Sequence, residues 1–160
     1  KIEAPEIRLQ VQNGQLTVKN SATPNCKGQG GGEKGCIVTG LEDIAFVRLV
    51  LQGSGQYKLT NLWICAGGSK PALTDPGDPR SFDCELLGDR NSEFLVITGG
   101  SVTKASPDGR VDLGGVREFY VLNQNTFQSD YFYLVEACKG QNDCSILDPR
   151  IRNGGRKVIR

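Results

Sequence analysis

Short runs of β-branched and aromatic residues, separated by turn-forming residues about every ten positions, fill most of this 160-residue sequence. Many of the runs carry apolar residues at every second position, the period of a strand with one buried face. The pattern predicts one domain over 1–160: an all-β, antiparallel β-sandwich, Ig-like or jelly-roll-like, with roughly 8–10 strands and little or no helix. The strand-like stretches are 7–18, 37–51, 56–65, 94–98, 101–105, 110–113, 116–123 and 130–138.

The clearest local pattern is a hairpin near the start of the chain. Ile7, Leu9 and Val11 alternate with polar residues, and the alternation resumes directly after Asn13-Gly14. Asn-Gly suits a two-residue type I′ turn because both central residues need positive φ. We therefore predict two strands joined by a tight turn.

Residues 37–51 fit two structures. Thr39 and Glu42 have the spacing of a helical capping box. The stretch 44–51, however, is rich in β-branched and aromatic residues and has apolar side chains at every second position. We predict a buried strand, with a short helix over 41–51 as the alternative.

The stretch 130–138 is apolar on both of its faces, because Tyr131, Phe132 and Tyr133 follow one another. A strand with one face in water normally alternates with polar residues. We expect another part of the chain or a partner to cover its second face.

Six cysteines fall into three neighbouring pairs along the chain. Pairing neighbours closes three short loops without passing one element through another. The spacings lack the repeated C-x2-C of zinc sites, so we predict disulfides and an oxidising location: extracellular, cell surface or periplasm. The predicted bridges are Cys26–Cys36, Cys65–Cys84 and Cys138–Cys144.

The composition argues against several functions. The chain has no His, which excludes His-based triads and His metal sites, and it has no S-x-x-K or G-x-S-x-G motif. The net charge of +1 gives no general attraction to nucleic acid, and no apolar stretch approaches the ~20 residues of a membrane span. We predict a protein that is not an enzyme and has no cofactor.

The range 67–89 reads as a long loop that the second disulfide closes, since Gly, Pro, Ser and Asp dominate it. Its carboxylates could gather around Ca²⁺, but Asp-Pro-Gly-Asp-Pro is also typical of consecutive turns. We favour turns and predict no metal site. The calcium candidates are Asp75, Asp78, Asp83 and Glu85.

The C-terminal segment 148–160 is basic, while the rest of the chain is acidic. It is either a solvated tail or a segment that binds an acidic surface on another copy or on an anionic polymer. Its cations are Arg150, Arg152, Arg156, Lys157 and Arg160.

The run CSILDPRIRNGG over 144–155 resembles the Asp-Pro-x-Ile-x-Asn ending of small secreted bacterial β-proteins such as the DP-EP family. The resemblance implies a bacterial all-β domain. No activity is established for that family, so it implies none here.

Two non-catalytic functions fit these observations. The first is a self-assembling subunit of an extracellular filament, such as a pilus, or of another surface structure, with strand exchange between copies and residues 1–6 as a donor strand. The residues expected to take part, besides the five C-terminal cations, are Ile7, Leu9, Val11, Tyr131 and Tyr133. The partners would be copies of the chain itself.

The second function is a secreted adhesion module that binds a surface polysaccharide or a host or cell-surface protein. The loop 67–89 and exposed rings would form its binding site. A third possibility, a carboxylate-based hydrolase, lacks a recognisable pair of carboxylates.

Overall fold

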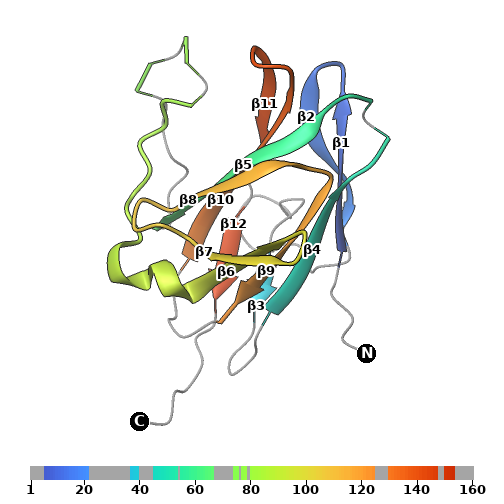
Figure 1. Ribbon diagram of the computed structural model, residues 1–160. Coiled ribbons are helices and arrows are strands. Elements are labelled where there is room, and N and C mark those ends of the chain that lie inside the picture. The colour runs from blue at the N-terminus through green and yellow to red at the C-terminus, as the bar shows by residue number, and fades with distance from the viewer. Residues whose placement is uncertain are drawn as a thin grey trace.

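The computed structural model describes residues 6–21, 37–39, 45–53, 55–66, 74–75, 77–78, 80–124, 130–147 and 150–153. Within these ranges the chain forms two six-stranded β-sheets that pack as a sandwich (Figure 1). The predicted all-β fold is confirmed. The described residues form twelve strands rather than roughly 8–10, because the stretch 37–51 contains two strands and two short strands follow 130–139.

The first sheet has the order β2-β1-β4-β9-β6-β7, and the second has the order β3-β12-β10-β5-β8 with β11 also paired to β10. The strands of the first sheet are β1 (Glu6–Gln12), β2 (Gln15–Ser21), β4 (Ala45–Leu51), β6 (Phe94–Thr98), β7 (Ser101–Lys104) and β9 (Glu118–Asn123). Those of the second are β3 (Ile37–Thr39), β5 (Lys58–Ala66), β8 (Arg110–Val116), β10 (Asp130–Lys139), β11 (Asp143–Leu147) and β12 (Arg150–Asn153).

The sandwich is not purely antiparallel. β1 runs parallel to β4, and β3 runs parallel to β12. Parallel neighbours need a long connection between them, and here other strands intervene in the sequence in both cases. The alternation of apolar and polar residues along one strand does not show whether the neighbouring strand runs parallel or antiparallel to it.

One hydrophobic core fills the space between the sheets, and buried residues of β1, β2, β4, β5, β6, β8, β9 and β10 form it together with Leu87 and Ala105. Burying a side chain of this kind stabilises the fold by roughly 1.5–3 kcal/mol. The largest fully buried side chains are Tyr131, Phe94, Phe119, Ile7, Leu9, Leu49, Leu51, Leu59, Leu62, Ile64 and Leu113.

Two turns have backbone geometry that the sequence accounts for. Asn13 and Gly14 have φ of 53° and 76°, which confirms the predicted hairpin turn. Gly109 has φ of 83° and lies so close to β5 that a Cβ atom there would be 1.9 Å from the backbone oxygen of Ile64. The N–H of Ile64 donates to the carbonyl of Gly109 at 2.9 Å, so this contact pins the loop before β8 to the sheet.

Two of the three predicted disulfides are confirmed. Cys65 and Cys84 are joined with a Cα–Cα distance of 5.1 Å, and Cys138 and Cys144 with one of 4.1 Å. The predicted Cys26–Cys36 bridge lies outside the described residues. The bridges fit an oxidising compartment.

The one helical element in the described ranges is a 3₁₀ helix, η1 (Gly88–Glu93), consistent with the prediction of little or no helix. Among the described residues there is no helix with the length and apolar character needed to cross a membrane.

Candidate functional site

The described residues of 74–87, which we call the strap, are fastened to the outer face of the second sheet. Cys84 is bonded to Cys65 of β5, and the ring of Phe82 meets that of Trp63 edge to face at 5.0 Å. The N–H of Ala66 donates to the carbonyl of Glu85 at 2.9 Å. The long loop predicted over 67–89 is thus held against β5 by covalent, aromatic and backbone contacts.

The second face of β10 is covered, and the strap lies against part of it through Arg80. Phe132, Leu134, Glu136 and Cys138 point away from the core, yet all four are buried. The register places Phe132 beside Cys65 and Leu134 beside Trp63, where the strap is attached. The expectation that something covers this face is confirmed.

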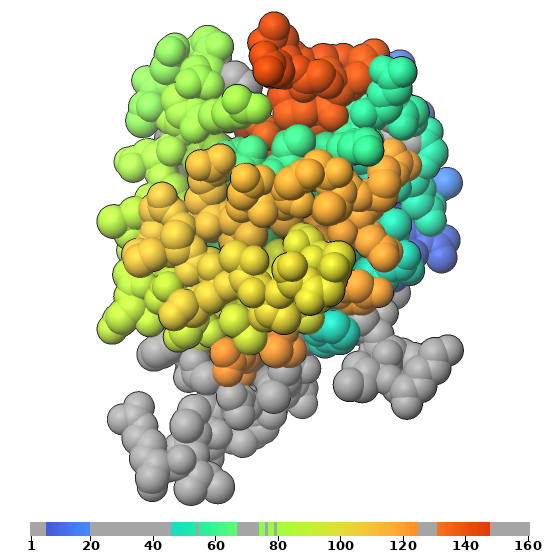
Figure 2. All heavy atoms as spheres, viewed as in Figure 1, coloured from blue at the N-terminus to red at the C-terminus, as the bar shows by residue number. Residues whose placement is uncertain are grey.

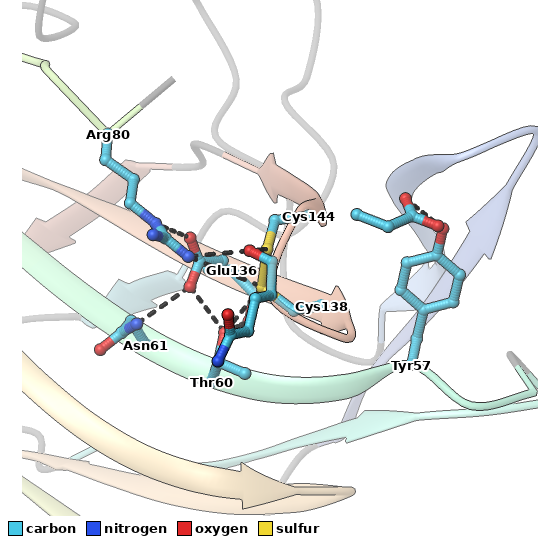
Figure 3. Close-up of a disulfide and its surroundings, with 9 residues drawn as sticks. Tyr57, Thr60, Asn61, Arg80, Glu136, Cys138 and Cys144 are labelled. Atoms are coloured by element: carbon cyan, nitrogen blue, oxygen red, sulfur yellow. Dashed lines mark hydrogen bonds and ion pairs between the residues drawn. A yellow bond between two sulfur atoms is a disulfide. The ribbon is translucent and has the colours of Figure 1, made fainter. Parts of the chain in front are cut away.

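A buried charge lies in the middle of this covered face. Glu136 of β10 is fully buried, and its carboxylate accepts hydrogen bonds from Arg80 Nε at 2.6 Å, Asn61 Nδ2 at 2.9 Å and Thr60 Oγ1 at 2.7 Å (Figure 3). Burial alone would raise the pKa of Glu136, but the hydrogen bonds from its three partners outweigh that effect. The pKa therefore lies below its ordinary value, and Glu136 is ionised.

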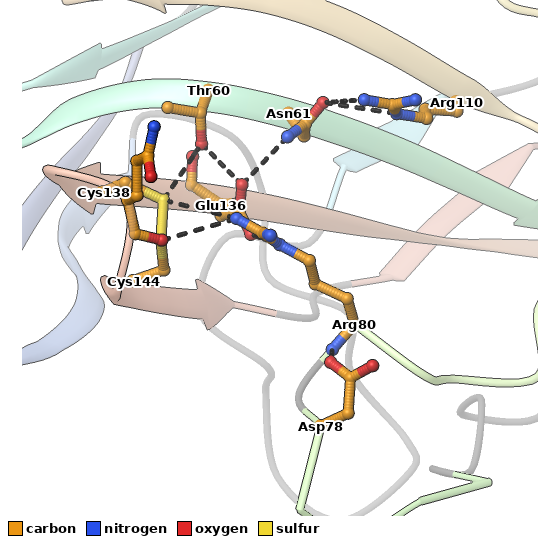
Figure 4. Close-up of polar contacts among 9 residues, drawn as sticks. Thr60, Asn61, Asp78, Arg80, Arg110, Glu136, Cys138 and Cys144 are labelled. Atoms are coloured by element: carbon orange, nitrogen blue, oxygen red, sulfur yellow. Dashed lines mark hydrogen bonds and ion pairs between the residues drawn. A yellow bond between two sulfur atoms is a disulfide. The ribbon is translucent and has the colours of Figure 1, made fainter.

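Arg80 belongs to the strap, so it connects the loop to β10 through a charge. The hydrogen bond from Arg80 to Glu136 raises the pKa of the guanidinium. The backbone N–H of Arg80 donates to Asp78 Oδ1 at 2.9 Å, and Arg110 donates to Asn61 Oδ1 at 3.2 Å on the other side of the cluster (Figure 4). The cluster therefore links the strap with β5, β8 and β10.

Glu136, Cys138 and Cys144 bring three potential metal ligands within 4.8 Å of one another. The two sulfur atoms are bonded to each other, so neither is a thiolate that could bind a metal. Arg80 Nη2 also lies 3.5 Å from Cys144 Sγ and 3.9 Å from Cys138 Sγ. The guanidinium of Arg80 lies against all three groups, so the cluster is a structural contact that holds the strap against β10.

The carboxylates predicted as possible calcium ligands form turns where their contacts are described. Asp75 Oδ1 accepts a hydrogen bond from the N–H of Gly77 at 3.0 Å, and Asp78 caps Arg80 in the same manner. Asp83 and Glu85 are exposed. In the described part of the chain, these four carboxylates do not come together as a group of three metal ligands.

The apolar residues that we expected to contact partners lie inside the domain. Ile7 and Leu9 are fully buried in the core, and Val11 packs against it. Tyr131 and Tyr133 are buried too, and Tyr131 meets the ring of Phe94 edge to face at 5.0 Å. Of these five, only Val11 is partly exposed in the folded domain. The strand pattern located them correctly on inward faces, but it did not show that two sheets enclose them.

The basic C-terminal residues are only partly placed. β12 carries Arg150 and Arg152 into the second sheet, where its backbone pairs with β10 and β3. The side chains of these two residues lie outside the described part, as do Arg156, Lys157 and Arg160.

The outer face of the first sheet bears an apolar patch that we did not foresee, here called the outer patch. The register places Lys104, Leu95, Leu122 and Phe46 in one row and Val102, Ile97, Tyr120 and Arg48 in the next. Six of these side chains are apolar or aromatic, on a face that antiparallel sheets usually make polar. The outer patch consists of Phe46, Leu95, Ile97, Val102, Tyr120 and Leu122.

Two rings of the outer patch stack on each other, and ion pairs lie beside them. Phe46 and Tyr120 stack with centroids 5.3 Å apart and an interplanar angle of 12°. Beside them Arg48 bridges two carboxylates, with Nη1 2.7 Å from Glu6 Oε2 and Nε 2.7 Å from Glu118 Oε2. The hydrogen bond from Arg8, more than the charge of Arg48, lowers the pKa of Glu6. The patch is thus an apolar surface with a charged border, a composition typical of binding surfaces.

The outer patch ends at a free sheet edge. β7 pairs with β6, and among the described residues it has no second neighbour. All four of its residues are exposed, and the side chain of Val102 is 63% exposed. Figure 2 shows this yellow segment at the surface of the molecule. A free edge of this kind can accept another strand.

Sequence patterns could have indicated part of this site. The runs FLVI at 94–97 and FYVL at 119–122 are apolar at successive positions, as 130–138 is, and so predict two apolar faces. Glu136 within an apolar strand indicates a buried partner. Nothing in the sequence identifies Arg80, 56 positions away, as that partner.

No family model and no curated protein matches this chain. Among solved structures, the McoA multicopper oxidase from the hyperthermophile Aquifex aeolicus is similar over 95% of this chain, with 10% identity and a TM-score of 0.36. The chain spans 31% of the length of that oxidase. A likeness at this level transfers neither fold family nor activity.

Proposed function

We propose that this chain is a non-catalytic, extracellular structural protein that assembles with copies of itself into a filament or another surface structure, by adding strands at sheet edges. The observation that carries the proposal is the exposed edge strand β7, which borders the outer patch. Unpaired backbone groups and an adjoining apolar surface are the features that strand addition uses. The disulfides support a location outside the reducing cytosol.

The fold limits which segments can be exchanged. β1 lies between β2 and β4, and both of its edges are paired. A donor strand at the N-terminus would therefore have to consist of residues before Glu6, whose carboxylate is bound to Arg48. Deleting residues 1–5 should abolish assembly through such a donor while leaving the sandwich intact.

Negative-stain microscopy and sedimentation of the native protein test the proposal. We expect concentration-dependent assemblies that persist with the disulfides oxidised. A protein that remains monomeric at high concentration, with no fibres or sheets in the images, would contradict self-assembly.

The stacked rings of the outer patch favour a second candidate function, a secreted module that binds a carbohydrate or a protein. In this case Y120A should abolish binding to an oligosaccharide panel or a cell surface without changing the fold. K19C, at an exposed position of β2, provides a control that should bind as the parent does. Binding that survives Y120A would contradict the patch as the binding site.

A further inference from the structure

The backbone N–H and C=O groups of β7 point alternately toward its hairpin partner, β6, and toward the free edge of the sheet. A two-residue loop, 99–100, joins β6 to β7, and its glycines have φ of 54° and 90°. In such a turn the carbonyl of Thr98 accepts from the N–H of Ser101, so Ser101 directs its backbone groups to β6. Because the direction alternates along a strand, Val102 and Lys104 direct their N–H and C=O groups outward.

We propose that β7 pairs antiparallel with β7 of a second copy, about a two-fold axis at Thr103. Thr103 then lies opposite Thr103 of the other copy, and Val102 of each copy lies opposite Lys104 of the other. The inference rests on the proposed self-assembly and specifies its contact.

This register uses all of the outward groups on the edge. Val102 and Lys104 each exchange two hydrogen bonds with their opposite residue, as residues in a hydrogen-bonded antiparallel pair do. The two lysines do not face each other, and the aliphatic stem of each lies over an exposed Val102. A threonine pair at the axis is a favourable cross-strand combination. A second copy of the chain is therefore a complementary partner.

The pairing also continues the outer patch from one copy to the next. Val102 lies beside Ile97 in the register, so the two patches meet across the new junction. The sheet of one copy and that of its neighbour become one sheet with a continuous apolar face.

Two other described edges, those of β8 and β2, are less suited to adding a strand. β8 has a register shift against β5 and contains Gly114 and Gly115 with positive φ, a distortion that blocks regular pairing. On β2 the N–H of Leu16 donates to Ser145 Oγ of β11 at 2.8 Å. β7 is regular over its whole length.

A cysteine at the axis would trap the pairing. Cys138 and Cys144 lie directly opposite each other on antiparallel strands and form a disulfide at a Cα–Cα distance of 4.1 Å. T103C would place two cysteines opposite each other in the same way. Under mild oxidation we expect a disulfide-linked dimer from T103C, and little from V102C, which is offset in this register, or from K19C on β2.

A second pair of variants tests the backbone contacts themselves. In the T103C background, V102P removes an outward N–H and leaves the bonds between β6 and β7 in place, whereas V102T keeps that N–H. We expect V102P to reduce the cross-linked fraction several-fold relative to V102T. Equal fractions would overturn the pairing. Thermal unfolding of both variants reveals whether either one misfolds.

The outcomes separate this inference from the proposed function. Parent protein that assembles while T103C cross-links no more than K19C overturns the β7 pairing and leaves self-assembly standing. T103C dimers together with a parent that forms no larger assemblies support the pairing and overturn the filament. More dimer from V102C than from T103C overturns the register.

Discussion

Arg80 and Glu136 form an ion pair with an Nε–Oε2 distance of 2.6 Å, in which the carboxylate is fully buried and the arginine side chain is 48% exposed. The arginine belongs to the strap and the glutamate to β10. The pair therefore adds to the other contacts that hold this loop, which are the Cys65–Cys84 bridge, the Phe82–Trp63 ring contact and the backbone hydrogen bond from Ala66 to Glu85.

Replacing Arg80 with Ala should destabilise the fold by about 1–3 kcal/mol, because Glu136 keeps its charge in a buried position with one partner missing. Water reaches the arginine, so the loss should be smaller than for a fully buried pair. Urea unfolding with the disulfides intact measures the difference. R110A removes an exposed arginine at the edge of the same cluster and should change stability by less than about 0.5 kcal/mol. Equal effects of the two variants would show that the ion pair is not stabilising.

Acid should weaken the fold partly through Glu136. Its pKa is lower in the folded protein than its ordinary value of 4.5, so its contribution is fully present above pH 4.5 and is lost as the pH falls through the folded value. The free energy of unfolding should therefore decrease below about pH 4.5, and more steeply in the parent than in E136Q. Urea titrations at several pH values between neutral and acid would measure both slopes.

The E136Q variant isolates one carboxylate among several. Hydrogen bonding from Arg8 lowers the pKa of Glu6, and hydrogen bonding from Ser106 lowers that of Asp108. These two groups should leave E136Q with a residual slope of the same sign. Identical slopes in the parent and E136Q would contradict a depressed pKa at Glu136.

Gly109 should tolerate no side chain. In G109A the new Cβ would lie 1.9 Å from the backbone oxygen of Ile64, and the residue would also need positive φ. A loss above about 4 kcal/mol is expected. G100A is the matched control, since Gly100 has φ of 90° but open space around it, and its cost should be about 1–2 kcal/mol. Thermal unfolding compares the two, and similar melting temperatures would contradict the close approach.

The two disulfides should differ in their contribution to stability. The sequence separations are 19 for Cys65–Cys84 and 6 for Cys138–Cys144, for which loop entropy gives about 3 and about 2 kcal/mol. Removing the first bridge with C65S/C84S also frees the strap, which should become sensitive to protease. C138S/C144S should leave the strap protected, because the Cys65–Cys84 bridge still holds it. Cleavage of the strap at equal rates in both variants would contradict this division of roles.

The sequence predicted the parts of the fold that depend on neighbouring residues. Alternation around Asn13-Gly14 defined the β1–β2 hairpin, and the period-2 pattern of 44–51 correctly favoured a strand over a helix. The predicted stretches 101–105 and 110–113 correctly separated β7 from β8. In each case the decisive contacts lie within about ten residues of one another, where propensity and turn chemistry act.

Features that depend on distant contacts escaped prediction. The parallel pairing of β1 with β4 depends on how the chain crosses between the sheets, which alternation does not encode. Tyr131 was expected at a partner surface because an aromatic residue in a strand has the same pattern whether a sheet or a partner covers it. The Arg80–Glu136 pair joins a polar loop to an apolar strand, and neither stretch indicates the other.

The central position of β10 has a consequence for how quickly the chain can fold. β10 pairs with β5, and the side chains that meet there include Thr60 and Glu136, 76 positions apart. A loop of 76 positions must close before this contact forms, and pairing between strands so far apart in the sequence is typical of slow folding in sheet proteins. Cys138 and Cys144 are only 6 positions apart, so they can form their disulfide before β5 pairs with β10. The small bridge would then fix the β10–β11 hairpin early and provide a template for the rest of the second sheet.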